Sequence, residues 1–427
     1  MIIFLLWVVG IGVAGTIAYM AGRLLLDVYR VSAQRRYDSS VGQLAPLWRD
    51  TKVLAILAQV AFAVVIGGIF FYLWGNFQDR ADAIGLELNF DFLDQPAGIK
   101  IADNPLSPAD TVSEAIIAGF FNTLRIIVVG IPLAMILGTL MGISRLSSNW
   151  LMRKIATGYV EFFRNLPPLV VIFLIWAGVF LSAFPKAAES WKPGGWFIFN
   201  NSRFAFPSVE GLDNFVAFRW ILLAGLLVAA AVAYWRTQVF INTGTQHRRV
   251  LWGVGTFLAI GAVAFVVLGG PAKISLPSID DAGRVYEGGI RMQMPFAAVV
   301  TALVLYTGTH IAEIVRGSIQ AVHSGQVEAS EALALSGFQR YRFVILPQAM
   351  RIAFPALINQ FLNFSKNSSL AVAIGFGEIT SIISNLNGQS LPAPQLILIL
   401  MLMYLVISLV LSALGNTINR RLQIVGR

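Results

Sequence analysis

The sequence predicts an all-α, polytopic membrane protein with about nine transmembrane helices. Of its 427 residues, 57% are hydrophobic and only 12% are charged, whereas soluble domains carry roughly 25% charged residues. The mean hydropathy is +0.72. The apolar residues gather in segments of about 20 residues, the length that a helix needs to cross a bilayer. These segments lie near residues 2–21, 53–74, 115–143, 162–183, 218–235, 250–269, 296–315, 352–374 and 394–415.

The charges between these segments predict the orientation of the chain. One set of loops is basic, and the alternate set, including residues 76–110, is acidic or balanced. Basic loops stay on the cytoplasmic side of a membrane. We therefore expect the N-terminus outside and the C-terminus in the cytoplasm, and we assign the net charge of +9 to membrane topology rather than to nucleic acid. The basic loops contain Arg23, Arg30, Arg35, Arg36, Arg49, Lys52, Arg145, Arg153, Lys154, Arg236, Arg248, Arg249, Arg420, Arg421 and Arg427.

The first apolar segment has two interpretations. Residues 1–21 could be a signal peptide that is removed, or a retained anchor. No positive charge precedes the apolar run, and no small-x-small cleavage site stands out before Arg23. We therefore expect a retained anchor.

A polar, alanine-rich segment at residues 324–347 separates two apolar segments. Its charged side chains cannot face lipid, so it is expected on a membrane face where another protein can bind. Ser324 is predicted to cap a helix that carries Glu328 in its first turn and ends at Gly337. Pro347 is predicted to open the next membrane helix. The residues alone leave open a second possibility, a solvated amphipathic hairpin without a partner.

Residues 328–347 resemble the cytoplasmic EAA loop of the permease subunits of bacterial ABC importers. That loop reads Glu-Ala-Ala, three residues, Gly, nine residues, then Ile-x-Leu-Pro. This chain has the expected residue at Glu328, Ala329, Leu346 and Pro347, and has substitutions at Ser330, Ala334 and Val344. Because Ala334 replaces the Gly, the sharp turn could lie there or at Gly337.

The resemblance extends over roughly residues 45–427 and is closest to the polar amino acid uptake branch, which includes histidine, glutamine and general L-amino acid permeases. It rests on the segments that begin Tyr159-Val-Glu-Phe-Phe-Arg, Ile311-Ala-Glu-Ile-Val-Arg and Lys366-Asn-Ser-Ser-Leu. It implies a five-helix permease core with additions. The implied divisions are 1–110 for extra N-terminal helices and a periplasmic loop, 111–185 for the first part of the core, 186–294 for an insertion with two extra helices, and 295–427 for the second part of the core.

The resemblance also implies function and partners. The chain would be the transport subunit of an ATP-driven importer of polar or general L-amino acids in a bacterial inner membrane, and not itself an enzyme. A separate ATP-binding subunit would bind ATP and Mg, a homologous second permease subunit would complete the pore, and a periplasmic binding protein would deliver the L-amino acid. A heterodimer of permeases is expected, with a homodimer left open. The implied ATPase-coupling residues are Gly325, Glu328, Ala329, Ser330, Ala332, Ala334, Gly337, Leu346 and Pro347.

A polar stripe runs along the segment 352–374. Its residues Asn359, Asn363, Lys366 and Asn367 stand at offsets 0, 4, 7 and 8, which places them on one helical face. A lysine in the centre of a membrane costs about 2.5 to 3.5 kcal/mol, so Lys366 should face protein, water or a ligand. The stripe could be an internal helix contact. Alternatively it lines the translocation route, with Lys366 and Ser368 near a substrate carboxylate.

Three further sets of charges have two interpretations each. Arg125 could extend to the outer interface or attract an anionic group. Glu161 with Arg164, and Glu313 with Arg316, are Glu-x-x-Arg pairs at helical spacing. We expect each pair to form an ion pair that stabilises the helix bundle, with a gating role as the alternative.

Other functions find little support in the sequence. The chain has no cysteine, and His310 is the only histidine in a predicted span, so no metal site is expected. No Walker A sequence occurs, so energy must come from a partner or from an ion gradient. An ion-coupled secondary amino acid transporter that uses Lys366, Glu313 and Arg125 is therefore the alternative, although no inverted duplication is evident.

Overall fold

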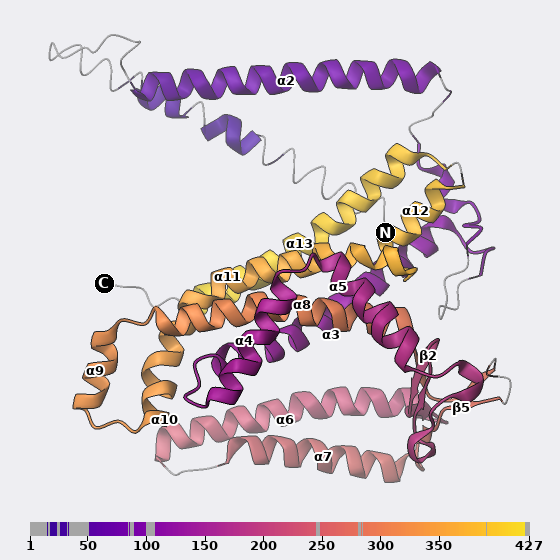
Figure 1. The fold of residues 1–427 in the computed structure, drawn as a ribbon, viewed down its shortest axis with the longest axis vertical. Helices are drawn as coiled ribbons and strands as arrows, with labels where there is room; N and C mark the ends of the chain where they lie inside the picture. Colours follow the sequence, from indigo (N-terminus) through magenta and orange to yellow (C-terminus); the bar gives the residue numbers. More distant parts are fainter. Residues whose placement is uncertain are drawn as a thin grey trace. The chain divides into compact units, whose positions relative to one another are not determined.

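The computed structural model is mostly helical (Figure 1). It describes residues 15, 18–23, 26–31, 33, 51–83, 85, 89–99, 107–244, 248–280, 283, 285–389 and 391–422. The chain forms two compact units. The first comprises Met1–Asn165 and Leu303–Arg427, and the second Leu166–Ala302.

The first unit is built from helices. Helix α8 begins in the second unit and continues into the first unit. Three short helical segments lie between the longer helices. They are the 3₁₀ helix η2 (Asp91–Asp94), the π-helix η6 (Tyr341–Ile345) and the 3₁₀ segment η7 (Ser368–Ile374). The α-helices are α2 (Thr51–Ala83), α3 (Val112–Ser144), α4 (Trp150–Arg164), α8 (Met294–Gln320), α9 (Ser324–Ala332), α10 (Gly337–Arg340), α11 (Leu346–Asn367), α12 (Ile379–Asn387) and α13 (Ala393–Leu422).

Six helices are long and apolar enough to cross a membrane, and eight spans result if each of two broken helix pairs counts as one. The predicted helical membrane class is confirmed, but the predicted number of nine is not. The segment 2–21 falls mostly outside the described residues. The segments predicted as spans at 162–183 and 352–374 each lie in a broken helix pair. The first breaks between Arg164 and Pro168, and the second belongs to a helical run, 337–374, that meets α12 at 50°.

The core of the first unit lies where α12 packs against α3 and α13. A capping box starts α3, because the Thr111 hydroxyl accepts from the Glu114 N–H and the Glu114 side chain accepts from the Thr111 N–H. Further along α3, glycines permit close helix contacts. A Cβ on Gly130 would lie 2.1 Å from Phe364 Cζ of α11, and one on Gly138 would lie 2.6 Å from Ile311 of α8. Small residues of this kind let membrane helices approach each other.

The second unit contains short strands that the sequence analysis did not predict. They form a three-stranded antiparallel sheet in the order β1-β2-β7 and two two-stranded sheets, β3-β4 and β5-β6. Strands of two to four residues are too short to show a periodic pattern in the sequence. Their bounds are β1 (Ile198–Phe199), β2 (Arg203–Phe206), β3 (Ser208–Gly211), β4 (Ala272–Ser275), β5 (Ser278–Ile279), β6 (Tyr286–Glu287) and β7 (Ile290–Gln293).

The helices of the second unit flank these strands in sequence. The apolar helix α5 (Pro168–Ile175) continues into the π-helix η3 (Trp176–Leu181), and two 3₁₀ turns, η4 (Ala187–Glu189) and η5 (Pro193–Gly195), follow. Helices α6 (Phe215–Thr243) and α7 (Arg249–Val267) lie side by side as an antiparallel hairpin (Figure 1).

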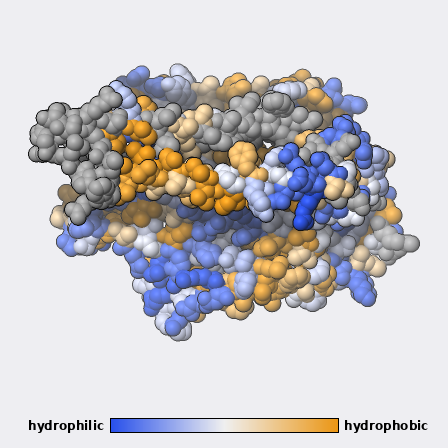
Figure 2. Space-filling view, turned by 90° about the horizontal axis from the view of Figure 1, so that it is seen from above, coloured by the Kyte–Doolittle hydropathy of each residue, from blue (hydrophilic) through white to orange (hydrophobic). Residues whose placement is uncertain are grey.

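Apolar and polar side chains gather in separate areas on one face of the protein (Figure 2). The face drawn in Figure 2 has broad apolar areas, in orange, beside polar ones, in blue. Large apolar side chains such as Phe71, Leu227 and Val266 are more than 70% exposed. Exposed apolar helices of spanning length are expected for a chain that meets lipid with one part and water with another.

Candidate functional site

The polar segment 324–347 folds as two short helices joined by a tight turn. The Nδ1 atom of His323 accepts from the Gly325 N–H at 3.1 Å, so His323 rather than Ser324 caps α9. Helix α9 ends at Ala332, and Gly337 begins α10 instead of ending α9. Both predictions were wrong, and Gly337 does not end α9 because a capping box formed by Ser336 and Gln339 starts a new helix within the segment.

The turn between these helices lies at Ala334. This residue has a φ of +53°, in the left-handed region, and Gly337 is not among the described residues with positive φ. The Ala334 N–H donates to the Glu331 carbonyl, and the Leu335 N–H donates to the Ser330 carbonyl. This is the hydrogen-bonding pattern of a Schellman motif, in which glycine usually takes the left-handed position. The turn therefore lies at Ala334, the position where the resembled loop has glycine. The Cβ of Ala334 strains the left-handed backbone there.

The segment presents charged and apolar side chains together. Glu328, Ala329 and Ala332 are exposed, and Leu333 and Phe338 are 74% and 72% exposed. An ion pair of 2.8 Å between Glu331 and Arg340 joins the two short helices. Ser330 is buried and donates to the Val327 carbonyl, and Gly325 is half-buried. A polar segment with large exposed apolar side chains is suited to contact with another protein.

Helical structure continues through Pro347 rather than beginning there. The π-helix η6 precedes Leu346 and Pro347, which lie in the first turn of α11. Proline lacks an N–H and its ring crowds the carbonyl four residues earlier, and a wider π turn accommodates both effects. Pro347 lies in the first two positions of α11, as predicted for the residue that opens this membrane helix, and the π-helix adds helical structure before it.

The polar stripe on α11 lies on an uncovered face. Asn359, Asn363 and Lys366 are exposed, whereas Asn367 is half-buried. Ser368 is fully buried, and its hydroxyl donates to the Ser365 carbonyl at 2.6 Å. The expectation that Lys366 and Ser368 lie near a substrate carboxylate stays a prediction, and of these two side chains only Lys366 is accessible in this chain.

Arg125 is exposed on α3 and is held by a short chain of hydrogen bonds. Its guanidinium donates to Asn122 Oδ1 at 3.2 Å. The buried Asn122 amide in turn donates to the Gly377 carbonyl at 2.8 Å, at the turn before α12. Arg125 is thus fixed in orientation beside the α3–α12 contact.

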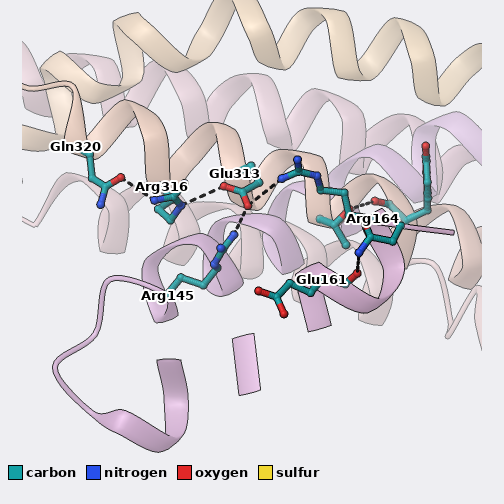
Figure 3. Close-up of polar contacts among 9 residues, drawn as sticks. Arg145, Glu161, Arg164, Glu313, Arg316 and Gln320 are labelled. Carbon is teal, nitrogen blue, oxygen red and sulfur yellow. Dashed lines mark hydrogen bonds and ion pairs between the residues drawn. The ribbon is translucent and has the colours of Figure 1, made fainter. Parts of the chain in front are cut away.

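Glu313 lies at the centre of a cluster of three arginines (Figure 3). One carboxylate oxygen, Oε1, accepts from Arg145 and, at 3.2 Å, from Arg164. The other, Oε2, accepts from Arg316 Nε at 3.1 Å. Arg316 also donates to Gln320 at 2.8 Å. The cluster joins the ends of α3 and α4 to α8.

The predicted pair of Glu313 with Arg316 forms, whereas the predicted pair of Glu161 with Arg164 does not. Arg164 contacts Glu313 instead, and the part of the chain that the structure describes contains no ion pair between Arg164 and Glu161. The Glu161 carboxylate points away from the cluster (Figure 3), and only its carbonyl accepts a bond, from Asn165 at 2.8 Å. The sequence analysis missed Arg145 in this role because Glu313 lies 168 residues away and no local spacing connects the two.

Glu378 is a buried carboxylate that the sequence analysis also missed. It has no exposed surface and caps α12, accepting from the N–H groups of Thr380 and Ser381 at 2.9 and 2.8 Å. The Tyr404 hydroxyl of α13 also donates to it. An acidic residue directly before an apolar helix is the sequence signal that could have revealed this cap.

A cavity of about 630 Å³ opens beside the polar segment. Its lining is mostly apolar and comes from the end of α3, the start of α4, the end of α8 and the α10–η6 region, with Ile143, Met152, Ile319, Phe338 and Tyr341 among its residues. Within the described residues no group of three or more potential metal ligands occurs.

A match to known proteins identifies the family of this chain. Residues 130–424 match the model of the family "binding-protein-dependent transport system inner membrane component". The chain belongs to this family. The match spans α4, the polar segment and α11 to α13. Together with its long apolar helices, it makes this inner membrane component a multi-pass membrane protein.

Two relatives that match most of the chain support the assignment. The general L-amino acid transport system permease protein AapQ of Rhizobium johnstonii is 35% identical over 88% of this chain and 94% of its own. The glutamate/glutamine/aspartate/asparagine transport system permease protein BztB of Rhodobacter capsulatus is 34% identical over 90% of this chain and 96% of its own. A crystal structure of an amino acid ABC transporter with histidines is 20% identical and covers 72% of this chain and 94% of that chain, with a TM-score of 0.43.

Proposed function

We propose that this inner membrane component is a permease subunit of an ATP-driven ABC importer that carries polar or general L-amino acids into a bacterial cell. The substrate class rests on the names of its full-length relatives, which describe transport of L-amino acids. The observation that carries the coupling mechanism is the exposed polar segment 324–347, which interrupts the apolar helices. Because this chain lacks a Walker A sequence, a separate subunit would have to bind ATP. That subunit would need an exposed surface of the permease to contact.

The coupling partner would be a separate ATP-binding subunit that holds ATP and Mg. It would contact the surface formed by Glu328, Ala329, Ala332 and Leu333, with Phe338 beside it. Movement of this subunit during ATP hydrolysis would shift α9 and α10, and the α10–η6–α11 run would transmit that shift to the membrane helices. The Glu331–Arg340 ion pair supports this role because it makes the two short helices move together.

A second, homologous permease subunit would cover the polar face of α11. Asn359, Asn363 and Lys366 are exposed in this single chain. An exposed lysine at membrane depth costs about 2.5 to 3.5 kcal/mol on insertion scales, so a protein or water-filled surface must face it. We infer that this stripe lines the substrate route, with Lys366 close to the substrate carboxylate. Arg125 is a weaker candidate for the same route.

The remaining assignments follow from topology. Basic loops on the cytoplasmic side give a periplasmic N-terminus, a cytoplasmic C-terminus and a cytoplasmic coupling segment. A periplasmic binding protein would then deliver the amino acid to the opposite face. Residues 186–294 would form an insertion in a core composed of 111–185 and 295–427, preceded by the additional region 1–110.

Co-purification with the ATP-binding subunit tests the coupling assignment. Glu328→Arg and Ala332→Trp should abolish association while the permease still inserts in the membrane, because both change the exposed surface of α9. Glu189→Arg is a matched control, since it reverses an exposed charge outside the segment. Retention of the ATP-binding subunit by both loop variants would contradict the proposal. Uptake driven by an ion gradient in vesicles without an ATPase would favour a secondary transporter instead.

A further inference from the structure

The hairpin of α6 and α7 carries an unusual set of charges. Residues 214–270 contain no aspartate, glutamate or lysine, and their only charged side chains are Arg219, Arg236, Arg248 and Arg249. These arginines therefore have no carboxylate partner within the hairpin. Arg219 stands near the start of α6, whereas the other three stand toward the turn that joins the helices.

Aromatic rings bring the three arginines at the turn to one side of the hairpin. The Arg236 guanidinium of α6 lies 4.3 Å from the centre of the Trp252 ring of α7 and 5.5 Å from that of Trp235. Trp252 follows Arg248 by four residues and Arg249 by three, so these side chains share a helical face. The cation–π contact thus connects Arg236 to the basic end of α7.

Among the described residues, no carboxylate pairs with the arginines at this end of the hairpin. Arg248 and Arg249 are exposed, and the buried Nε of Arg236 has no hydrogen-bond partner among the described residues. Both arginines of α7 stand at its N-terminus, where the helix dipole adds positive potential. An anionic group is the missing complement.

The neighbouring surface identifies the chemistry of that group. Tyr234, Trp235, Val250 and Leu251 are each about 60% exposed or more, and they form apolar surface directly beside the arginines. Close contacts at Gly225 and Gly253 hold the two helices together, so these side chains point outward rather than into the hairpin. Charge next to exposed apolar and aromatic groups fits an amphiphile at the membrane interface.

We propose that Arg236, Arg248 and Arg249 bind the headgroup phosphate of an anionic phospholipid in the cytoplasmic leaflet. The leaflet rests on the topology under "Proposed function", whereas the site itself requires only the hairpin. The arginines pair with the phosphate, and the acyl chains lie along the apolar side chains next to them. An acidic segment of another protein is the competing ligand, and it lacks acyl chains for this apolar surface.

Lipid titration of the complete purified complex tests this proposal. The delipidated complex in neutral detergent is titrated with phosphatidylglycerol, phosphatidylcholine and inorganic phosphate, and bound lipid is counted by native mass spectrometry. Each basic residue near an anionic membrane surface contributes about a fivefold gain in affinity. The triple variant Arg236→Gln, Arg248→Gln, Arg249→Gln should therefore bind phosphatidylglycerol about a hundredfold more weakly. Arg219→Gln is the control for loss of an arginine elsewhere in the hairpin and should bind normally, because it removes one charge at the other end of α6.

The outcomes separate the alternatives. Triple replacement by lysine keeps the charge and should retain most of the binding, which also covers the case in which the glutamine variant misfolds. Equal binding of phosphatidylglycerol by the glutamine variant and by the unmodified complex would overturn the proposal. So would full competition by inorganic phosphate, or loss of a co-purifying protein with lipid binding unchanged. None of these measurements depends on amino acid transport, so failure here and failure of the importer assignment are distinguishable.

Discussion

The hydroxyl of Tyr404 donates a hydrogen bond of 3.1 Å to the carboxylate of Glu378, which is fully buried. Glu378 stands where the helical run 337–374 gives way to α12 at an angle of 50°. Its carboxylate oxygens accept the first N–H groups of α12, and Tyr404 ties the same group to α13. One side chain thus fixes the start of α12 and its contact with α13.

Glu378→Ala should lower the free energy of unfolding by about 2 to 4 kcal/mol. The change removes a helix cap and leaves the N–H groups of Thr380 and Ser381 without an acceptor in a buried site. Thermal unfolding of the purified complex measures the effect. Tyr404→Phe is the matched control, since it removes one hydrogen bond and should cost about 1 kcal/mol. An equal loss in both variants would contradict the capping role.

Removal of the shared carboxylate should separate the arginines around it. Glu313→Gln leaves Arg145 and Arg164 facing each other without a negative charge, and we expect a loss of about 2 kcal/mol. Arg145→Gln should cost more than Arg164→Gln, because their side chains are 14% and 54% exposed and solvent screens the second pair. Glu161→Gln should have almost no effect. A double-mutant cycle between positions 313 and 145 should give a clear coupling energy, and its absence would refute the cluster.

The left-handed residue in the coupling segment makes a local prediction. Ala334→Gly should stabilise the turn by about 0.5 to 1 kcal/mol, because the strain of a Cβ at a φ of +53° exceeds the entropy cost of glycine. Ala329→Gly, inside α9, should destabilise by a similar amount. Hydrogen exchange of the amides in residues 324–340 measures both. Faster exchange in the Ala334 variant would show that the turn is not strained.

The exposed lysine on α11 is open to a transport test. Lys366→Gln should lower amino acid uptake into vesicles that contain the complete importer by roughly tenfold, by loss of a charge-assisted contact with the substrate. Lys366→Arg keeps the charge and should retain most of the uptake. Both variants must still co-purify with the partner subunits. Normal uptake by the glutamine variant would exclude Lys366 from the substrate route.

Much of this protein was predictable from local sequence. Apolar segments of spanning length, the polar segment 324–347 and the polar face of α11 are all properties of neighbouring residues. Hydrophobic length and helical spacing report these properties without any knowledge of tertiary contacts. The family signature at Glu328 and Pro347 could likewise be found in the chain alone.

Tertiary structure decided which charges meet. Arg145 joins Glu313 across 168 residues, and Arg164 contacts Glu313 instead of its neighbour Glu161. Glu378 meets Tyr404 because the packing of α13 brings that side chain to it. Spacing along one helix reports only pairs within that helix, whereas an ion pair goes to whichever opposite charge the packed helices bring closest. The sequence therefore determined the membrane helices and the exposed segment, and packing determined the network that connects them.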